Sequence, residues 1–159
     1  MDEKKLAIIA TKGTLDWAYP PFILASTAAA LGYESQIFFT FYGLQLVKKD
    51  LNLKVSSLGN PGMPMPAGMD KWFPVILQAL PGMEGMMTAM MKKKMAAKGV
   101  AGLDELRELC IEAEVKMVAC QMTVELFDMD HSDFIDDLEF AGAASFFEFA
   151  GDSDICLYI

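Results

Sequence analysis

Cysteine and histidine are scarce in this sequence, and their scarcity excludes several kinds of chemistry. The 159 residues include three cysteines, Cys110, Cys120 and Cys156, and one histidine, His131. No Cys-x-x-Cys pair occurs, so a thioredoxin-type dithiol is excluded, and the lack of clustered ligands argues against a zinc site. A hydrolase triad would have to rely on His131, which lies in an acidic turn and is expected at the surface. We therefore expect no metal and no other cofactor.

Positive charge is missing from the C-terminal part of the chain. All 13 basic residues lie at or before Lys116, and the formal net charge is −9. Phosphate neutralisation needs clustered lysine and arginine, so we expect no nucleic acid partner. The acidic part either attracts a basic protein or forms a solvated surface. Its acidic residues are Glu125, Asp128, Asp130, Asp133, Asp136, Asp137, Glu139, Glu148, Asp152 and Asp154.

Long hydrophobic runs are absent as well. The run Leu6–Ala10 is shorter than the ~7–15 residues of a signal-peptide core. No stretch approaches the ~18 apolar residues of a membrane span. We therefore expect a cytoplasmic protein with reduced thiols and no transmembrane segment. The mean hydropathy of +0.29 is nevertheless high for a small chain, which predicts an apolar groove or a subunit interface.

Segments typical of strands alternate with segments typical of helices. The sequence predicts strands at 4–10, 34–41, 115–119 and 155–159, with a short strand or extended segment at 136–140. It predicts helices at 22–31, 44–50, 103–114, 122–129 and 143–150. This alternation indicates one α/β domain over 1–159, a three-layer α/β/α arrangement around a mostly parallel five-stranded sheet. A Met- and Pro-rich, partly helical insertion is expected at about 60–98.

Three segments follow predicted strands at their carboxyl ends, where ligands bind in such sheets. They are Thr11–Asp16, Thr40–Gly43 and the residues after Ala119. Cys120 stands between a strand and a helix, where free backbone N–H groups can stabilise a thiolate. Thr123 or the backbone N–H groups near it could hold a sulfur-bound anion, and Lys12 could add positive charge from the neighbouring loop. Cys110 and Cys156 are expected in the core, because free cysteine often behaves as a small buried hydrophobe.

Four segments together give the chain a family resemblance. They are 12–16 after the first strand, 38–44 with its Phe-Phe-Thr-Phe-Tyr-Gly-Leu run, 118–123 with Cys-Gln-Met-Thr, and 142–146. In this order they resemble the DsrE/DsrF-like family over nearly the whole chain, and most closely its branch with a Met/Pro-rich insertion. The resemblance implies a flavodoxin-like subunit that forms homo-oligomers, with trimers and hexamers as candidates.

The same resemblance implies a function and a site. Family members carry sulfane sulfur as a persulfide and exchange it with a TusA-like sulfur carrier or a rhodanese-type donor, and their active cysteine matches Cys120. A thiolate can take and pass on sulfur without a general base, so the lack of a second histidine is no obstacle. The residues expected to support Cys120 are Lys12, Gly13, Thr14, Thr40, Tyr42, Gly43, Gln121, Met122 and Thr123.

Methionine is concentrated in the insertion. Met63 and Met65 precede a helical pattern that carries further methionines from Met83 to Met95. Thioethers can bind Cu(I), but an apolar face for a neighbouring subunit explains the pattern without metal and is preferred. Lys92–Lys94 interrupt the run of methionines and would repel a cation. With Lys98 they could also touch an anionic lipid surface, a weaker peripheral membrane contact.

The sequence leads to one main hypothesis and one alternative. The main hypothesis is a sulfur-relay protein, or sulfurtransferase, that carries a persulfide on Cys120. The alternative is a non-catalytic binding or scaffold subunit of the same fold, which applies if Cys120 is enclosed. The residues alone do not decide whether the chain is an enzyme.

Overall fold

The computed structural model describes residues 4–55, 58, 60, 62 and 75–159. The chain forms two compact units, one of Met1–Leu53 with Gly102–Ile159 and the other of Lys54–Ala101. The predicted insertion at 60–98 falls within the second unit. Within the described ranges, no helix combines the length and the hydrophobicity needed to cross a bilayer.

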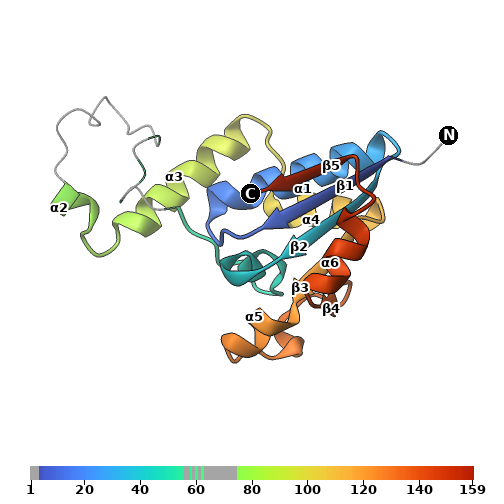
Figure 1. The fold of residues 1–159 in the computed structure, drawn as a ribbon. Helices are drawn as coiled ribbons and strands as arrows, with labels where there is room; N and C mark the ends of the chain where they lie inside the picture. The colour runs from blue at the N-terminus through green and yellow to red at the C-terminus, as the bar shows by residue number, and fades with distance from the viewer. Residues whose placement is uncertain (1–3, 56–57, 59, 61, 63–74) are drawn as a thin grey trace. The chain divides into compact units, whose positions relative to one another are not determined.

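A five-stranded parallel sheet forms the centre of the first unit (Figure 1). Its order is β4-β3-β2-β1-β5, and each neighbouring pair runs parallel. The strands are β1 (Lys5–Ala10), β2 (Glu34–Phe39), β3 (Lys116–Cys120), β4 (Glu139–Ala141) and β5 (Ile155–Tyr158). The three central strands are almost fully buried, as expected of continuous apolar strands covered on both faces.

Helices cover both faces of this sheet. Successive strand residues point to opposite faces, so Phe38 and Phe39 identify the two layers. The Phe39 ring packs against Phe22 of α1 (Leu15–Ala30), which lies beside α4 (Leu103–Glu112). The Phe38 ring packs against Phe146 of α6 (Ala143–Ala150). The predicted three-layer α/β/α fold with five strands is confirmed.

Three short elements complete the first unit. η1 (Phe41–Val47) follows β2, α5 (Gln121–Leu126) follows β3, and η3 (His131–Asp133) precedes β4. The guanidinium of Arg107 is buried and donates hydrogen bonds to the carbonyls of Leu46 and Lys48, at 3.4 and 2.7 Å. Burial lowers the pKa of Arg107 from its ordinary value. The contact fixes the end of η1 against α4.

Three predicted elements differ from those in the structure. The first helix begins at Leu15 and not at Phe22, so Pro20 and Pro21 lie inside it and not at its start. Burial of one apolar face, which includes Leu15 and Ala18, outweighs the cost of the prolines. The second strand ends at Phe39, and the predicted helix at 44–50 is a 3₁₀ helix that begins at Phe41.

The second unit contains α2 (Val75–Gln78) and α3 (Met83–Ala97). Met63 and Met65 lie outside the described residues. On α3, Met87 is buried, whereas Met86 and Met90 are exposed. The buried Thr88 hydroxyl accepts a hydrogen bond from the Val55 amide at 2.9 Å, which ties α3 to the start of this unit.

Candidate functional site

The loops after β1 and β2 lie directly against each other at the carboxyl edge of the sheet. A Cβ atom on Gly43 would fall 2.1 Å from the carbonyl oxygen of Ala10, and one on Gly13 would fall 2.5 Å from that of Tyr42. No side chain fits at either position. Both glycines are therefore required by the close approach of the two backbones.

The loop after β2 is also tied to α5. The Thr123 hydroxyl is fully buried, lies 3.2 Å from the Thr40 hydroxyl and accepts from the Phe41 amide at 3.4 Å. Phe41 has a φ of 49°, which a bulky residue rarely adopts. The Thr123 hydroxyl thus stabilises the strained turn. It was expected to hold an anion, but its hydrogen bonds go to the protein.

Cys120 is enclosed by apolar side chains. It is the last residue of β3 and stands immediately before α5, as expected from the sequence, yet only 5% of it is exposed. It belongs to a buried cluster with Ala7, Phe38, Val118 and Phe146, which we call the Cys120 cluster. Helix α6 supplies Phe146 and so contributes to the cover of this cluster.

The residues after Cys120 make local contacts on the surface. The Gln121 side chain donates to Glu125 at 2.9 Å and its carbonyl lies 3.0 Å from Nε2 of His131. His131 is exposed and stacks on Phe140, with ring centroids 3.8 Å apart. Hydrogen bonds from Ser132 to Asp130 lower the pKa of this carboxyl. Met122 is exposed on α5.

The other two cysteines, Cys110 and Cys156, differ in their exposure to solvent. Cys110 is fully buried on α4, as predicted, and burial raises the pKa of its thiol to about 11. Its Sγ donates to the carbonyl of Phe22 at 3.4 Å. Cys156 is exposed, so the prediction that it lies in the core was wrong. It belongs to β5, an edge strand whose side chains are incompletely covered by helices.

A groove of about 340 Å³ lies at the carboxyl edge, and we call it the Lys12 groove. Its six lining residues are Lys12, Gly13, Thr14, Trp17, Tyr42 and Gln45. The Lys12 ammonium lies 5.7 Å from the centre of the Trp17 ring, and the Tyr42 ring stacks on Phe127. Cys120, Gln121, Met122 and Thr123 do not line it. The structure thus brings together only part of the predicted set of site residues.

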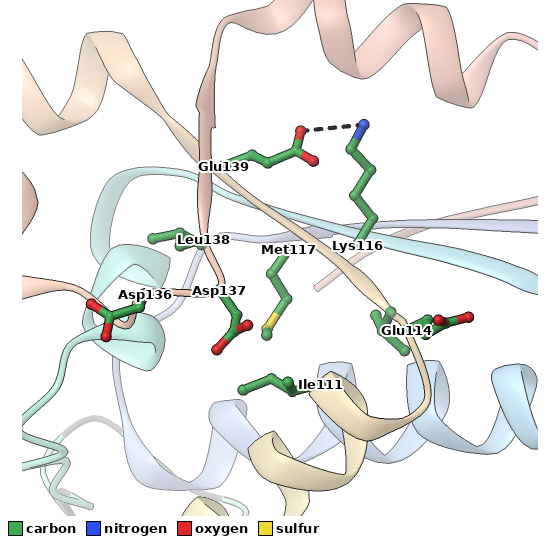
Figure 2. Close-up of a pocket in the computed structure, with 9 residues that line it drawn as sticks. Ile111, Glu114, Lys116, Met117, Asp136, Asp137, Leu138 and Glu139 are labelled. Carbon is green, nitrogen blue, oxygen red and sulfur yellow. Dashed lines mark ion pairs between the residues drawn. The ribbon is translucent and has the colours of Figure 1, made fainter.

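A second hollow, of about 440 Å³, lies at the opposite edge, where β3 and β4 begin (Figure 2). It is strongly acidic, with Glu114, Asp136, Asp137 and Glu139 among its lining residues, and none of the predicted site residues lines it. Lys116 pairs with Glu139 at 3.2 Å. Across the described ranges, no three His, Cys, Asp or Glu side chains gather closely enough to hold a metal ion.

Sequence reasoning missed three residues that shape these sites. Trp17 and Gln45 line the Lys12 groove, and Phe146 covers the Cys120 cluster. Thr14 and Trp17 are about one helical turn apart. A helix predicted to begin at Leu15 would have placed both residues at its start. No local signal distinguishes Phe146 from the exposed Phe147 beside it.

Comparisons with known proteins agree on one family. The model of the DsrE/DsrF/DrsH-like family matches residues 2–158. The protein named sulfur carrier protein DsrE2, from Allochromatium vinosum, is 79% identical over the full length of both chains. An uncharacterized protein of Bacillus subtilis, YrkE, is 33% identical over 98% of this chain and 97% of its own.

A solved structure matches at the level of the fold. The crystal structure of the ychN protein from Escherichia coli has a TM-score of 0.56 and 9% sequence identity, and the match covers 98% of this chain and 99% of that one. The family model spans almost every residue, and both relatives match essentially from end to end. This chain therefore belongs to the DsrE/DsrF/DrsH-like family.

Proposed function

We propose that this protein is a sulfur-relay protein that carries sulfane sulfur as a persulfide on Cys120 and exchanges it with a small carrier protein. The observation that carries the proposal is the full-length 79% identity to a protein named a sulfur carrier. The position of Cys120 at the end of β3, directly before a helix, supports its choice among the three cysteines. The reducing cytoplasm suits a protein whose three cysteines are all free thiols.

The transfer step is balanced without an oxidant. The Cys120 thiolate attacks the outer sulfur of a donor persulfide, R–S–SH. A new S–S bond forms on Cys120, the S–S bond of the donor breaks, and R–S⁻ leaves and takes up the proton that Cys120 lost. Attack by an acceptor thiolate on the outer sulfur reverses these roles and regenerates Cys120. No histidine or metal takes part in either direction.

The enclosure of Cys120 is the condition that favours a non-catalytic subunit, so the carrier role requires local opening of the Cys120 cluster. With 5% of the residue exposed, no donor sulfur reaches Sγ in the closed arrangement. The Phe146 ring, 5.3 Å from the Phe38 ring, must move before exchange occurs. In this role α6 covers the sulfur between transfers, which also protects a persulfide from oxidation.

The surface around α5 supports docking of a carrier protein. Met122 and Leu126 are exposed on this helix, and Phe41 and Tyr42 are exposed on the neighbouring loop. Both aromatic rings contact Phe127, directly after α5. Exposed apolar side chains of this kind are common at the centre of protein interfaces. The acidic residues from Glu125 to Asp133 favour a carrier with a basic rim.

Mass spectrometry of the reduced protein after exposure to a persulfide donor tests the proposal. One carried sulfur adds about 32 Da, and we expect that adduct on Cys120. Cys120→Ser should abolish the adduct on this peptide. Cys156→Ser is the matched control, because it removes an exposed thiol, and it should leave the Cys120 adduct intact.

One result would favour the non-catalytic alternative. If a small alkylating reagent modifies Cys120 in the folded protein but no donor places sulfur there, Cys120 is accessible and is not a carrier. An adduct confined to Cys156 would move the carrier role to that residue.

A further inference from the structure

The Lys12 groove has an unusual charge for this protein. Among its six lining residues, Lys12 is a cation and none is an acid, although the chain has 22 acidic and 13 basic residues. Within the described part of the chain, the Lys12 ammonium makes no ion pair and lies instead over the Trp17 ring. Asp16 is in the first turn of α1 but does not line the groove. The groove is therefore locally positive.

The walls of the groove are fixed by the surrounding structure. A Cβ atom on Gly13 would fall 2.5 Å from the Tyr42 carbonyl oxygen, so the two loops leave no room between them for a side chain. The Tyr42 ring is held by stacking on Phe127, with centroids 5.8 Å apart. Thr14 and Gln45 add a hydroxyl and an amide for hydrogen bonds. A volume of about 340 Å³ is at the small end of the range of small-molecule sites.

We propose that the Lys12 groove binds a low-molecular-weight thiol, or its persulfide, that carries a carboxylate. The carboxylate pairs with the Lys12 ammonium, and the body of the molecule lies against the Trp17 and Tyr42 rings. This proposal rests on the proposed sulfur relay for the sulfur content of the ligand, and it adds a small-molecule site distinct from the Cys120 cluster. Binding here is non-covalent and precedes any transfer.

The intrinsic fluorescence of Trp17 tests the proposal, with reduced glutathione as the probe. A saturable change in emission is expected for the wild-type protein, and a much smaller one for glutathione diethyl ester, whose carboxylates are masked. The change should vanish in Trp17→Phe, which leaves Trp72 as the remaining tryptophan. Lys12→Gln should weaken binding about fivefold, the effect of losing one exposed ion pair.

Lys4→Gln is the matched control. Lys4 also lies over an aromatic ring, 5.6 Å from the centre of Tyr33, but it does not line the groove, so binding should be unchanged. Equal affinities of wild-type and Lys12→Gln proteins, or of glutathione and its ester, would overturn the proposal. So would loss of the signal in Cys120→Ser, because the ligand would then sit at Cys120. If glutathione binds in the groove but no sulfur adduct forms on a Cys120 that can be alkylated, the carrier role of Cys120 is refuted and the binding site in the groove is not.

Discussion

Cys120 and the Lys12 groove lie at the same edge of the sheet but have opposite environments. Cys120 is surrounded by Ala7, Phe38, Val118 and Phe146 and is almost completely covered. The groove is open, carries one cation and presents two exposed aromatic rings. The residue suited to covalent chemistry is thus separated from the surface suited to recognition.

This difference indicates that binding and sulfur exchange are separate events. A reactive persulfide is best kept from water and oxidants, whereas a docking surface must be accessible before the partner arrives. The Thr40–Thr123 contact joins the two regions, because Thr40 precedes the Tyr42 wall of the groove and Thr123 follows Cys120 on α5. Substitutions at Gly43 and Phe146 each alter one of the two regions, and Cys110 provides a permanently enclosed thiol for comparison.

The largest effect is expected from filling the backbone contact that builds the groove. Gly43→Ala would place a methyl group 2.1 Å from the Ala10 carbonyl oxygen, which already accepts a hydrogen bond from the Thr40 amide. Backbone cannot yield as a flexible side chain can, so the free energy of unfolding should fall by about 3 kcal/mol. Chemical denaturation measures this change.

Gly142→Ala is the control for that variant. A Cβ at Gly142 meets no atom within 4 Å, and the loss should stay below about 1 kcal/mol, the usual cost at a helix N-cap. Equal losses in the two variants would mean that the close approach of Gly43 to the Ala10 carbonyl does not constrain the two loops.

The second-largest effect on stability is expected from ionisation of Cys110, a thiol that is permanently enclosed. Burial raises its pKa from 9.0 to about 11, so above pH 9 the unfolded chain releases a proton that the folded chain retains. The stabilising contribution is complete below this pH and is lost as the pH rises to about 11. Two pKa units correspond to a loss of at most about 2.7 kcal/mol.

Comparison with Cys110→Ala isolates this contribution. Denaturation from about pH 8 to pH 10.5 measures the unfolding free energy of both proteins. That of the wild-type protein should fall relative to that of the variant as the pH rises. Tyr19, whose pKa burial also raises, is present in both proteins and cancels. A difference that is constant with pH would show that the Cys110 thiol ionises in the folded protein.

The layers of the fold could be predicted from the sequence because buried strands have a recognisable local sequence pattern. Continuous apolar runs such as 37–39 predict strands covered on both faces, and the predicted order of strands and helices gives a parallel sheet. The position of Cys120 between a strand and a helix follows from the same pattern. The start of the first helix could not be predicted, because the prolines inside it are outweighed by packing at a distance.

The environment of Cys120 depends on contacts between distant segments and has no local signature. The cluster joins β1, β2, β3 and α6, and only the folded chain brings Phe146 to Cys120. The same limit explains Cys156, whose apolar neighbours suggest a core position although β5 is an edge strand. Sequence pattern reports that a strand is apolar, not whether another element covers it.

The smallest effect is expected from loosening the cover of Cys120. Phe146→Leu shortens the side chain that packs on Phe38 and should lower the cost of local opening by about 1.4 kcal/mol. Alkylation of Cys120, followed by mass spectrometry, should then be about tenfold faster. Phe147→Leu changes a neighbour that is 68% exposed and should leave the rate unchanged. Cys110 should stay unmodified in all three proteins, which excludes global unfolding as the cause, and equal Cys120 rates throughout would show that α6 does not control access to the sulfur.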